Sequence, residues 1–288
     1  METNADRFLE VSGSRVPVEK MAMETVDQGK LYKLKLRIVT DDPIYKSLNK
    51  LKMRGKDLSH IPREVYFLTE LEVLDMSPER EACLYYKLTG VSPYIGQLIN
   101  LRVLMLDTNE MIELPDEICL LSNLERLSLS NNHFAELPRN FGHLKNLTSL
   151  HLSNNEVKLF PSQICELEGL TFLDLCNNYI SRLPPQIRNM RNLETLIVFH
   201  NNLATIPEEI GDVKKLRTLW IGDNNIKSLP RSIVKLSYLD WGKTYTVSSV
   251  VDGNPLITPP VDVCKQGVMA IASFFEAYDR NGASTTRH

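Results

Sequence analysis

The sequence predicts an α/β solenoid, a fold in which short repeats stack so that their strands form one parallel sheet. Three observations predict it: a 23-residue period, apolar residues at the same offsets in each unit, and Asn and Pro at two fixed offsets. The clearest units are residues 124–146 and 147–169. Counted from the first leucine, positions 1, 4, 6, 11, 14, 18 and 21 are apolar, position 9 is Asn and position 15 is Pro. One such unit cannot bury its own leucines, so the units must stack.

Each offset has a physical reason. In the first of these units, Leu124, Leu127 and Leu129 alternate with polar residues, which predicts a short strand. Asn132 is expected to turn inward where the strand ends, so that its amide bonds main-chain groups that would otherwise be buried unpaired. Pro138 then starts the return segment on the outer, convex side.

The pattern LxxLxLxxNxL at a period of about 20–29 residues is the leucine-rich-repeat signature. We therefore expect a leucine-rich-repeat horseshoe with a parallel concave sheet, short helical or irregular convex segments and terminal caps.

The chain divides into three parts. Residues 1–47 are an N-terminal segment with a degenerate capping turn, 48–262 are nine repeat units, and 263–288 are a capping helix and tail. The units begin at Leu48, Leu71, Leu101, Leu124, Leu147, Leu170, Leu193, Leu216 and Leu239. Two units, 71–100 and 239–262, carry about seven extra residues: the first is 30 residues long, and in the last Leu239 to Asn254 spans 15 residues where 8 is normal. Both insertions are expected just after the strand, near the edge of the sheet. Insertions on one face of a solenoid are often functional, and the alternative is neutral loop growth.

The two ends of the stack depart from the pattern. Leu31, Leu34 and Leu36 repeat the strand spacing, so they predict a strand in the capping turn, and Val18–Gln28 could form a short helix before it. From Val263 onward, apolar residues recur at helical spacing, which predicts a helix laid over the last coil.

Composition narrows the class of protein. The 288 residues carry a net charge of −3, with 43% hydrophobic and 24% charged residues, which argues against a general nucleic-acid binder. The opening residues lack the basic and apolar regions of a secretory signal, and no apolar run is long enough to span a membrane. Position 19 of three units is a cysteine: Cys119, Cys165 and Cys264. This regular placement is typical of cysteines that serve as small buried hydrophobic residues in a reducing compartment. We expect a cytoplasmic monomer.

A family resemblance rests on the segment LPxxIxxLxxL, which recurs as LPDEICLLSNL, LPPQIRNMRNL, IPEEIGDVKKL and LPRSIVKLSYL. This segment resembles the intracellular, Ras-group type of leucine-rich-repeat protein. The ending GNPLITPPVDVCKQGVMAIASFFEAY is similar to the C-terminal cap of that group, and the long last unit resembles that of the Ras-suppressor type. The resemblance covers roughly residues 48–278. It implies a scaffold or adaptor that binds signalling proteins, such as a small GTPase, a phosphatase subunit or a LIM-domain adaptor.

The repeat register also predicts which residues a partner would meet. Positions 3, 5 and 7 point out of the concave face, and the same position in neighbouring strands recurs at about 4.8 Å. In the C-terminal half these positions hold the apolar concave cluster, namely Phe172, Ile197, Phe199 and Trp220. His151, Asp174 and His200 lie at its border as polar contacts. Clustered exposed aromatic residues tend to mark an interaction site. The alternative is that the C-terminal insertion or helix folds over them.

A second group of side chains lies at the N-terminal end of the same face. This basic cluster consists of Lys33, Lys35, Arg37, Lys50, Lys52 and Arg54. It predicts binding of an acidic partner or a phosphate. The alternative is a solvated sheet edge that resists aggregation.

The sequence offers little catalytic chemistry. His151 and Asp174 lie on adjacent strands and could pair, as could Cys176 and His200. A nucleophile needs a base within about 3 Å, an orienting group and an oxyanion site, which an open sheet does not obviously supply. The motifs GxxxxGK[ST], HExxH and CxxC are missing, so no cofactor or metal is expected.

These observations favour a non-enzymatic adaptor in signalling. One alternative is a substrate-recognition or targeting subunit of a ligase or phosphatase complex, with the two insertions as its second surface. The other alternative is a hydrolase that uses Cys176 and His200.

Overall fold

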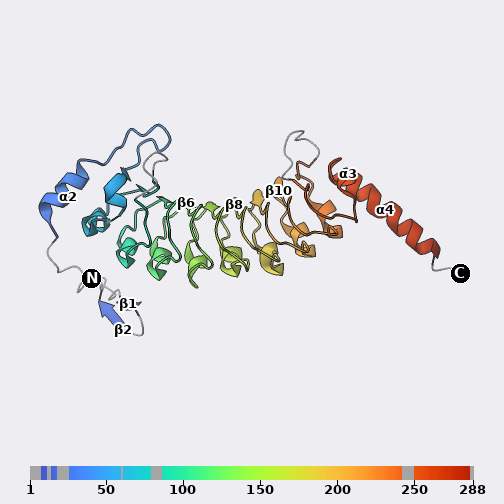
Figure 1. The fold of residues 1–288 in the computed structure, drawn as a ribbon, viewed down its shortest axis with the longest axis horizontal. Coiled ribbons are helices and arrows are strands. Elements are labelled where there is room, and N and C mark those ends of the chain that lie inside the picture. The colour runs from blue at the N-terminus through green and yellow to red at the C-terminus, as the bar shows by residue number, and fades with distance from the viewer. Residues whose placement is uncertain are drawn as a thin grey trace, which may run out of the picture.

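The computed structural model describes residues 8–11, 14–17, 26–59, 61–78, 86–241 and 250–285. Figure 1 shows an elongated, curved stack of coils with its strands along one side and short helical turns along the other. The N-terminal segment lies at one end of the stack and the longest helix lies at the opposite end.

The strands form one open parallel sheet in the order β10-β9-β8-β7-β6-β5-β4-β3. Their bounds are β3 Lys50–Lys52, β4 Val73–Asp75, β5 Val103–Met105, β6 Arg126–Ser128, β7 Ser149–His151, β8 Phe172–Asp174, β9 Thr195–Ile197 and β10 Thr218–Trp220. Equivalent positions pair without slippage, so Leu127 stands beside Leu150, which stands beside Leu173. The predicted leucine-rich-repeat solenoid is confirmed.

Short 3-10 helices make up the convex side. They are η1 Gly55–Leu58, η2 Arg63–Phe67, η3 Pro93–Gln97, η4 Asp116–Leu120, η5 Phe141–His143, η6 Ser162–Glu166, η7 Pro185–Asn189, η8 Glu208–Asp212 and η9 Arg231–Lys235. Pro115, Pro161 and Pro207 stand directly before such helices, at their N-caps. A proline fixes the backbone angle φ and has no N–H, so it suits a position where a helix starts.

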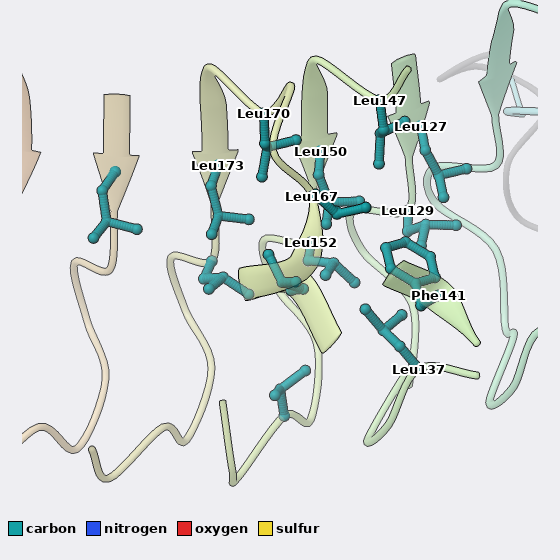
Figure 2. Close-up of a cluster of buried hydrophobic side chains, with 14 of the residues drawn as sticks. Leu127, Leu129, Leu137, Phe141, Leu147, Leu150, Leu152, Leu167, Leu170 and Leu173 are labelled. Carbon is teal, nitrogen blue, oxygen red and sulfur yellow. The ribbon is translucent and has the colours of Figure 1, made fainter. Parts of the chain in front are cut away.

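The core runs through the middle of the stack. The middle residue of each strand and the residue after the strand point inward, as Leu150 and Leu152 do in Figure 2, and both are fully buried. Burial of one leucine side chain contributes about 1.5–3 kcal/mol, so the repeated leucines dominate the stability.

From β5 to the last coil, a ladder of buried or half-buried asparagine side chains follows the strand positions. The Asn132 amide nitrogen Nδ2 donates to Leu106 O (3.0 Å) and Leu129 O (3.1 Å), and its Oδ1 accepts from Met111 N (3.1 Å). The same three-way bonding recurs at Asn109, Asn155, Asn178, Asn201, Asn224 and Asn254. Each predicted inward asparagine therefore links its own coil to the preceding coil.

The strand predicted from Leu31 to Leu36 is wrong. This segment belongs to helix α2 (Gln28–Lys35), because a spacing of three residues between leucines also fits a helix, and Asp27 caps it. The Asp27 Oδ1 accepts from Gly29 N at 2.9 Å and from Lys30 N at 3.1 Å. Before α2, β1 (Phe8–Val11) and β2 (Ser14–Pro17) form an antiparallel pair. Most of the helix expected at 18–28 lies outside the described residues.

The edge of the sheet is instead paired by a single residue ahead of β3. Val39 and Lys50 exchange two antiparallel backbone hydrogen bonds, each 2.9 Å long. This bridge supplies hydrogen bonds to main-chain groups at the edge of the sheet. A further parallel strand was expected to supply them.

The two long units differ in where their extra residues enter. In the first, Leu88 N donates to Asn109 Oδ1 (2.9 Å), so the repeat resumes at its position 11 and the insertion follows β4 as expected. In the last, Val250 O accepts from Ile221 N (2.8 Å), as Trp220 O accepts from Val198 N. Val250 therefore stands at position 5, and the extra residues enter within the expected ninth strand, not after it. Residues 79–85 and 242–249 lie outside the described part.

Two helices, α3 (Val261–Cys264) and α4 (Val268–Thr285), cover the C-terminal end of the stack. Within α4, Ile271 and Phe275 are buried. The Arg231 guanidinium binds both carboxylate oxygens of Asp279 at 2.6 Å and lies 5.1 Å from the centre of the Phe275 ring. The helix predicted from Val263 is thus two helices, and α4 is anchored on η9.

Candidate functional site

The apolar concave cluster lies on the open side of the last three described strands. Phe172 begins β8, Ile197 ends β9, Trp220 ends β10, and Phe199 follows β9 by two residues. All four side chains are half-buried, so each presents part of its surface to solvent. One row of paired positions crosses four strands: His151, Asp174, Ile197 and Trp220. The fold therefore gathers the predicted residues on one face.

His151 extends this apolar surface by one strand. Its ring centre lies 4.7 Å from that of Phe172, and its Nε2 is 3.0 Å from Ser149 Oγ. Burial, and next the positive charge of Arg126, lowers the pKa of His151 below its usual value. At neutral pH the imidazole is consequently uncharged and acts as an aromatic wall with one hydrogen bond.

The capping helices α3 and α4 do not cover the concave face. Helix α4 packs against η9, on the convex side of the stack, and not over the half-buried cluster. Coverage by the C-terminal insertion concerns residues 242–249, which lie outside the described part, so that alternative stays a prediction.

Cys176 and His200 are not arranged as a nucleophile and its base. Burial, and next the charge of Asp174, raises the pKa of the Cys176 thiol to about 12. The Asp174 carboxylate also accepts the Cys176 backbone N–H at 2.9 Å. His200 directs its Nδ1 toward Asp223 Oδ2 at 3.9 Å instead. The thiol is therefore protonated at neutral pH, which argues against the proposed hydrolase.

We expect Cys176 to react with iodoacetamide at pH 7.5 about a thousandfold more slowly than an unperturbed cysteine, because only the thiolate is nucleophilic. A mass-spectrometric time course on the folded protein measures this rate, and the urea-unfolded protein is the control that restores ordinary reactivity. Rapid modification of folded Cys176 would revive the hydrolase alternative.

The basic cluster is largely neutralised by the chain itself. Its ion pairs are Lys35–Glu70 (3.3 Å), Arg37–Asp57 (2.7 Å), Lys50–Asp42 (2.6 Å) and Lys52–Asp75 (3.1 Å). Lys33 is exposed on α2, and Arg37 also donates to Lys52 O at 3.2 Å. The six residues do lie at one end of the stack, but three of them stand on or after a helix and not on a strand. For Lys50, the acidic group that a partner was expected to supply comes from Asp42 of the same chain.

One feature of the concave face was missed by the sequence reasoning. The Tyr45 hydroxyl lies 3.8 Å from Met105 Sδ, so a residue before the first repeat contacts the face of the third strand in the sheet. The sequence does carry one sign of this contact: Val73 and Val103 are apolar although they occupy outward positions.

Among the described residues, no three His, Cys, Asp or Glu side chains are grouped so that they could hold a metal ion. None of the helices in the described part is long and apolar enough to cross a membrane.

Two family models match the sequence. Residues 88–170 match the model described as leucine-rich repeat region, and residues 168–226 match the model described as leucine rich repeat. Both matches fall on the regular coils between the two insertions. No curated protein sequence matches the chain significantly.

Solved structures with the same architecture come from bacteria and plants. A leucine-rich-repeat protein of Leptospira interrogans is 34% identical, with a TM-score of 0.62 over 71% of this chain and 51% of that one. The plant peptide hormone receptor RGFR1, in complex with RGF2, is 27% identical, with a TM-score of 0.55 over 66% of this chain and 30% of that one. The GASSHO1/SCHENGEN3 receptor kinase ectodomain of Arabidopsis thaliana, in complex with CASPARIAN STRIP INTEGRITY FACTOR 2, is 26% identical, with a TM-score of 0.55 over 72% and 23%. The chain spans about half or less of each of these proteins.

Proposed function

We propose that this leucine-rich-repeat solenoid is a non-enzymatic cytoplasmic adaptor that binds another protein through the apolar concave cluster. The observation that carries the proposal is the half-buried strip of Phe172, Ile197, Phe199 and Trp220 on the open side of the sheet. The core does not require apolar residues at these outward positions. Trp and other large aromatic anchors contribute much of the energy of typical protein interfaces.

The comparisons support binding in general terms. Two of the similar structures are repeat proteins in complex with another molecule, although those molecules concern those proteins alone. The sequence resemblance to the Ras group adds candidate partners: a small GTPase, a phosphatase subunit or a LIM-domain adaptor. Membership of that group stays a prediction. The four described cysteines are free thiols, which supports the cytoplasmic assignment.

The targeting-subunit alternative requires a second surface for the enzyme. The proposed surfaces are the two insertions, whose middle parts, 79–85 and 242–249, lie outside the described residues. That alternative stays a prediction, and signalling as the setting does too.

The test is a double substitution, Phe199→Ala with Trp220→Ala. We expect the variant to lose at least about tenfold in affinity for a partner, since each buried aromatic anchor contributes about 2 kcal/mol or more. Quantitative mass spectrometry would compare the proteins captured from cell extract by the wild type, the double variant and Tyr238→Ala. Tyr238 is a matched aromatic control, because it is 57% exposed and lies in the turn after η9, not on a strand, with Arg217 over its ring.

A captured protein supports the proposal only if the purified protein binds the wild type directly and the double variant weakly. The melting temperature of the double variant is expected to fall by a few degrees only, because the removed side chains are half-exposed. A large loss of stability, or unchanged capture, would show that these residues are not the binding site.

A further inference from the structure

The outward valines of β4 and β5 are buried, although they point out of the sheet. Val73 is 0% exposed and Val103 is 5% exposed. The same position in β6 holds Arg126, which is exposed, and in β8 it holds Phe172, which is half-buried. Some part of the chain therefore covers the N-terminal concave face while the C-terminal concave face stays open.

Residues 40–47, named here the 40–47 loop, form a compact turn ahead of β3. Ser47 N donates to Thr40 O at 3.1 Å and closes the loop. Inside it, Asp42 Oδ1 accepts from Ile44 N (2.9 Å) and Tyr45 N (3.0 Å). The loop thus holds its acidic and its aromatic side chain in a fixed relation to each other.

The acidic side chain of the loop is bound by the first strand. Lys50 Nζ lies 2.6 Å from Asp42 Oδ2. The hydrogen bond from Lys50, and next that from the Tyr45 N–H, lowers the pKa of Asp42 to about 2. At neutral pH the carboxylate is therefore ionised and held by a cation that projects from the concave face.

The aromatic side chain of the loop reaches across the sheet. Lys50 Nζ on β3 lies 5.0 Å from the Tyr45 ring centre, and Met105 Sδ on β5 lies 3.8 Å from the Tyr45 hydroxyl. β4 lies between these two strands, so the tyrosine side chain spans β4, which carries Val73. Tyr45 thus places an aromatic side chain over the part of the sheet whose outward positions are apolar.

We infer that the N-terminal concave face is a binding site for an acidic–aromatic peptide segment of the form Asp-x-x-Tyr, and that the 40–47 loop occupies it in the free chain. A partner that carries such a segment displaces the loop in trans. Lys50 binds its carboxylate, and Val73, Val103 and Met105 receive its aromatic ring. This site is separate from the apolar concave cluster, which begins beyond β7.

Two observations favour a site that exchanges its occupant. The loop contacts the concave face through the side chains of Asp42 and Tyr45, while the backbone pairing of the sheet edge belongs to Val39. Release of the loop therefore leaves the sheet hydrogen bonds intact. In addition, a face that was only solvated would carry polar residues at these positions, as β6 does with Arg126 and Ser128.

The test uses a fluorescent peptide with the sequence of residues 40–48 and the full-length protein. Fluorescence anisotropy compares its binding to the wild type, to Tyr45→Ala and to Lys46→Ala, an exposed control in the same loop. Tyr45→Ala is expected to bind the peptide at least about tenfold more tightly than the other two proteins, because its site is no longer filled in cis. Adding Lys50→Met to Tyr45→Ala, or replacing the peptide's tyrosine with alanine, should abolish that binding.

A second measurement reports on the cover directly. A cysteine placed by Val103→Cys should react slowly with a thiol reagent in the wild-type background and quickly together with Tyr45→Ala. Equal peptide binding by all three proteins, or a Val103→Cys thiol that stays protected without Tyr45, would overturn the inference. If Tyr45→Ala does not fold, Asp42→Ala opens the same loop and takes its place in both measurements.

Discussion

Asn178→Ala is expected to destabilise the protein by about 1–3 kcal/mol, although it removes no apolar surface. The Asn178 side chain is 4% exposed. Its Nδ2 donates to Leu152 O (2.9 Å) and Leu175 O (3.1 Å), and its Oδ1 accepts from Val157 N (3.0 Å). Leu152 O still accepts from Asn155 Nδ2 (3.1 Å) and Leu175 O from Asn201 Nδ2 (2.9 Å), so the Val157 N–H is the group that loses its partner. One buried donor left unpaired costs about 1–3 kcal/mol.

Urea unfolding followed by circular dichroism measures this loss. The matched control is Asn202→Ala, since Asn202 is an exposed asparagine one coil further along. Because each coil contacts only its neighbours, we also expect the weakened junction to separate the stack into two unfolding transitions. A loss below about 1 kcal/mol would mean that the ladder is dispensable for stability.

The parts of the fold that sequence predicts are the parts that repeat. A leucine or an asparagine at a given offset has the same surroundings in every coil, so one unit such as residues 124–146 determines the others. Leu31 and Leu34 have no such neighbours, and their spacing fits a strand and a helix equally. In this segment the Asp27 cap stabilises the helix. Likewise, only the pairing of Val250 with Ile221 reveals that the last insertion interrupts a strand.

For the candidate sites, sequence predicts positions but not partners. The outward direction of Phe172 and Trp220 follows from the strand register, because side chains alternate along a strand. The ion pair of Lys50 with Asp42 does not, since it depends on how a loop without periodicity folds back. For the same reason the raised pKa of Cys176, caused by burial and next by the charge of Asp174, does not follow from the sequence.

Phe141→Ala is expected to destabilise the protein by about 3–5 kcal/mol, the usual range for removing a buried phenylalanine. Phe141 begins η5, is 0% exposed and lies among the leucines shown in Figure 2. Neighbouring coils hold Ile164 and Ile187 at the same repeat position, both also fully buried. The cavity left by alanine cannot close easily, because the ladder of main-chain bonds fixes the distance between coils.

Phe141→Ile separates this cavity effect from a special requirement for an aromatic ring. Isoleucine fits the position in other coils, so this variant should lose clearly less stability than Phe141→Ala, since less volume is left empty. Leu159→Ala serves as the surface control, because Leu159 is 64% exposed and its truncation should change the unfolding free energy little. Urea unfolding of the three variants gives the order. If Phe141→Ile were as damaging as Phe141→Ala, the ring itself would be required, and the repeat positions would not be interchangeable at this coil.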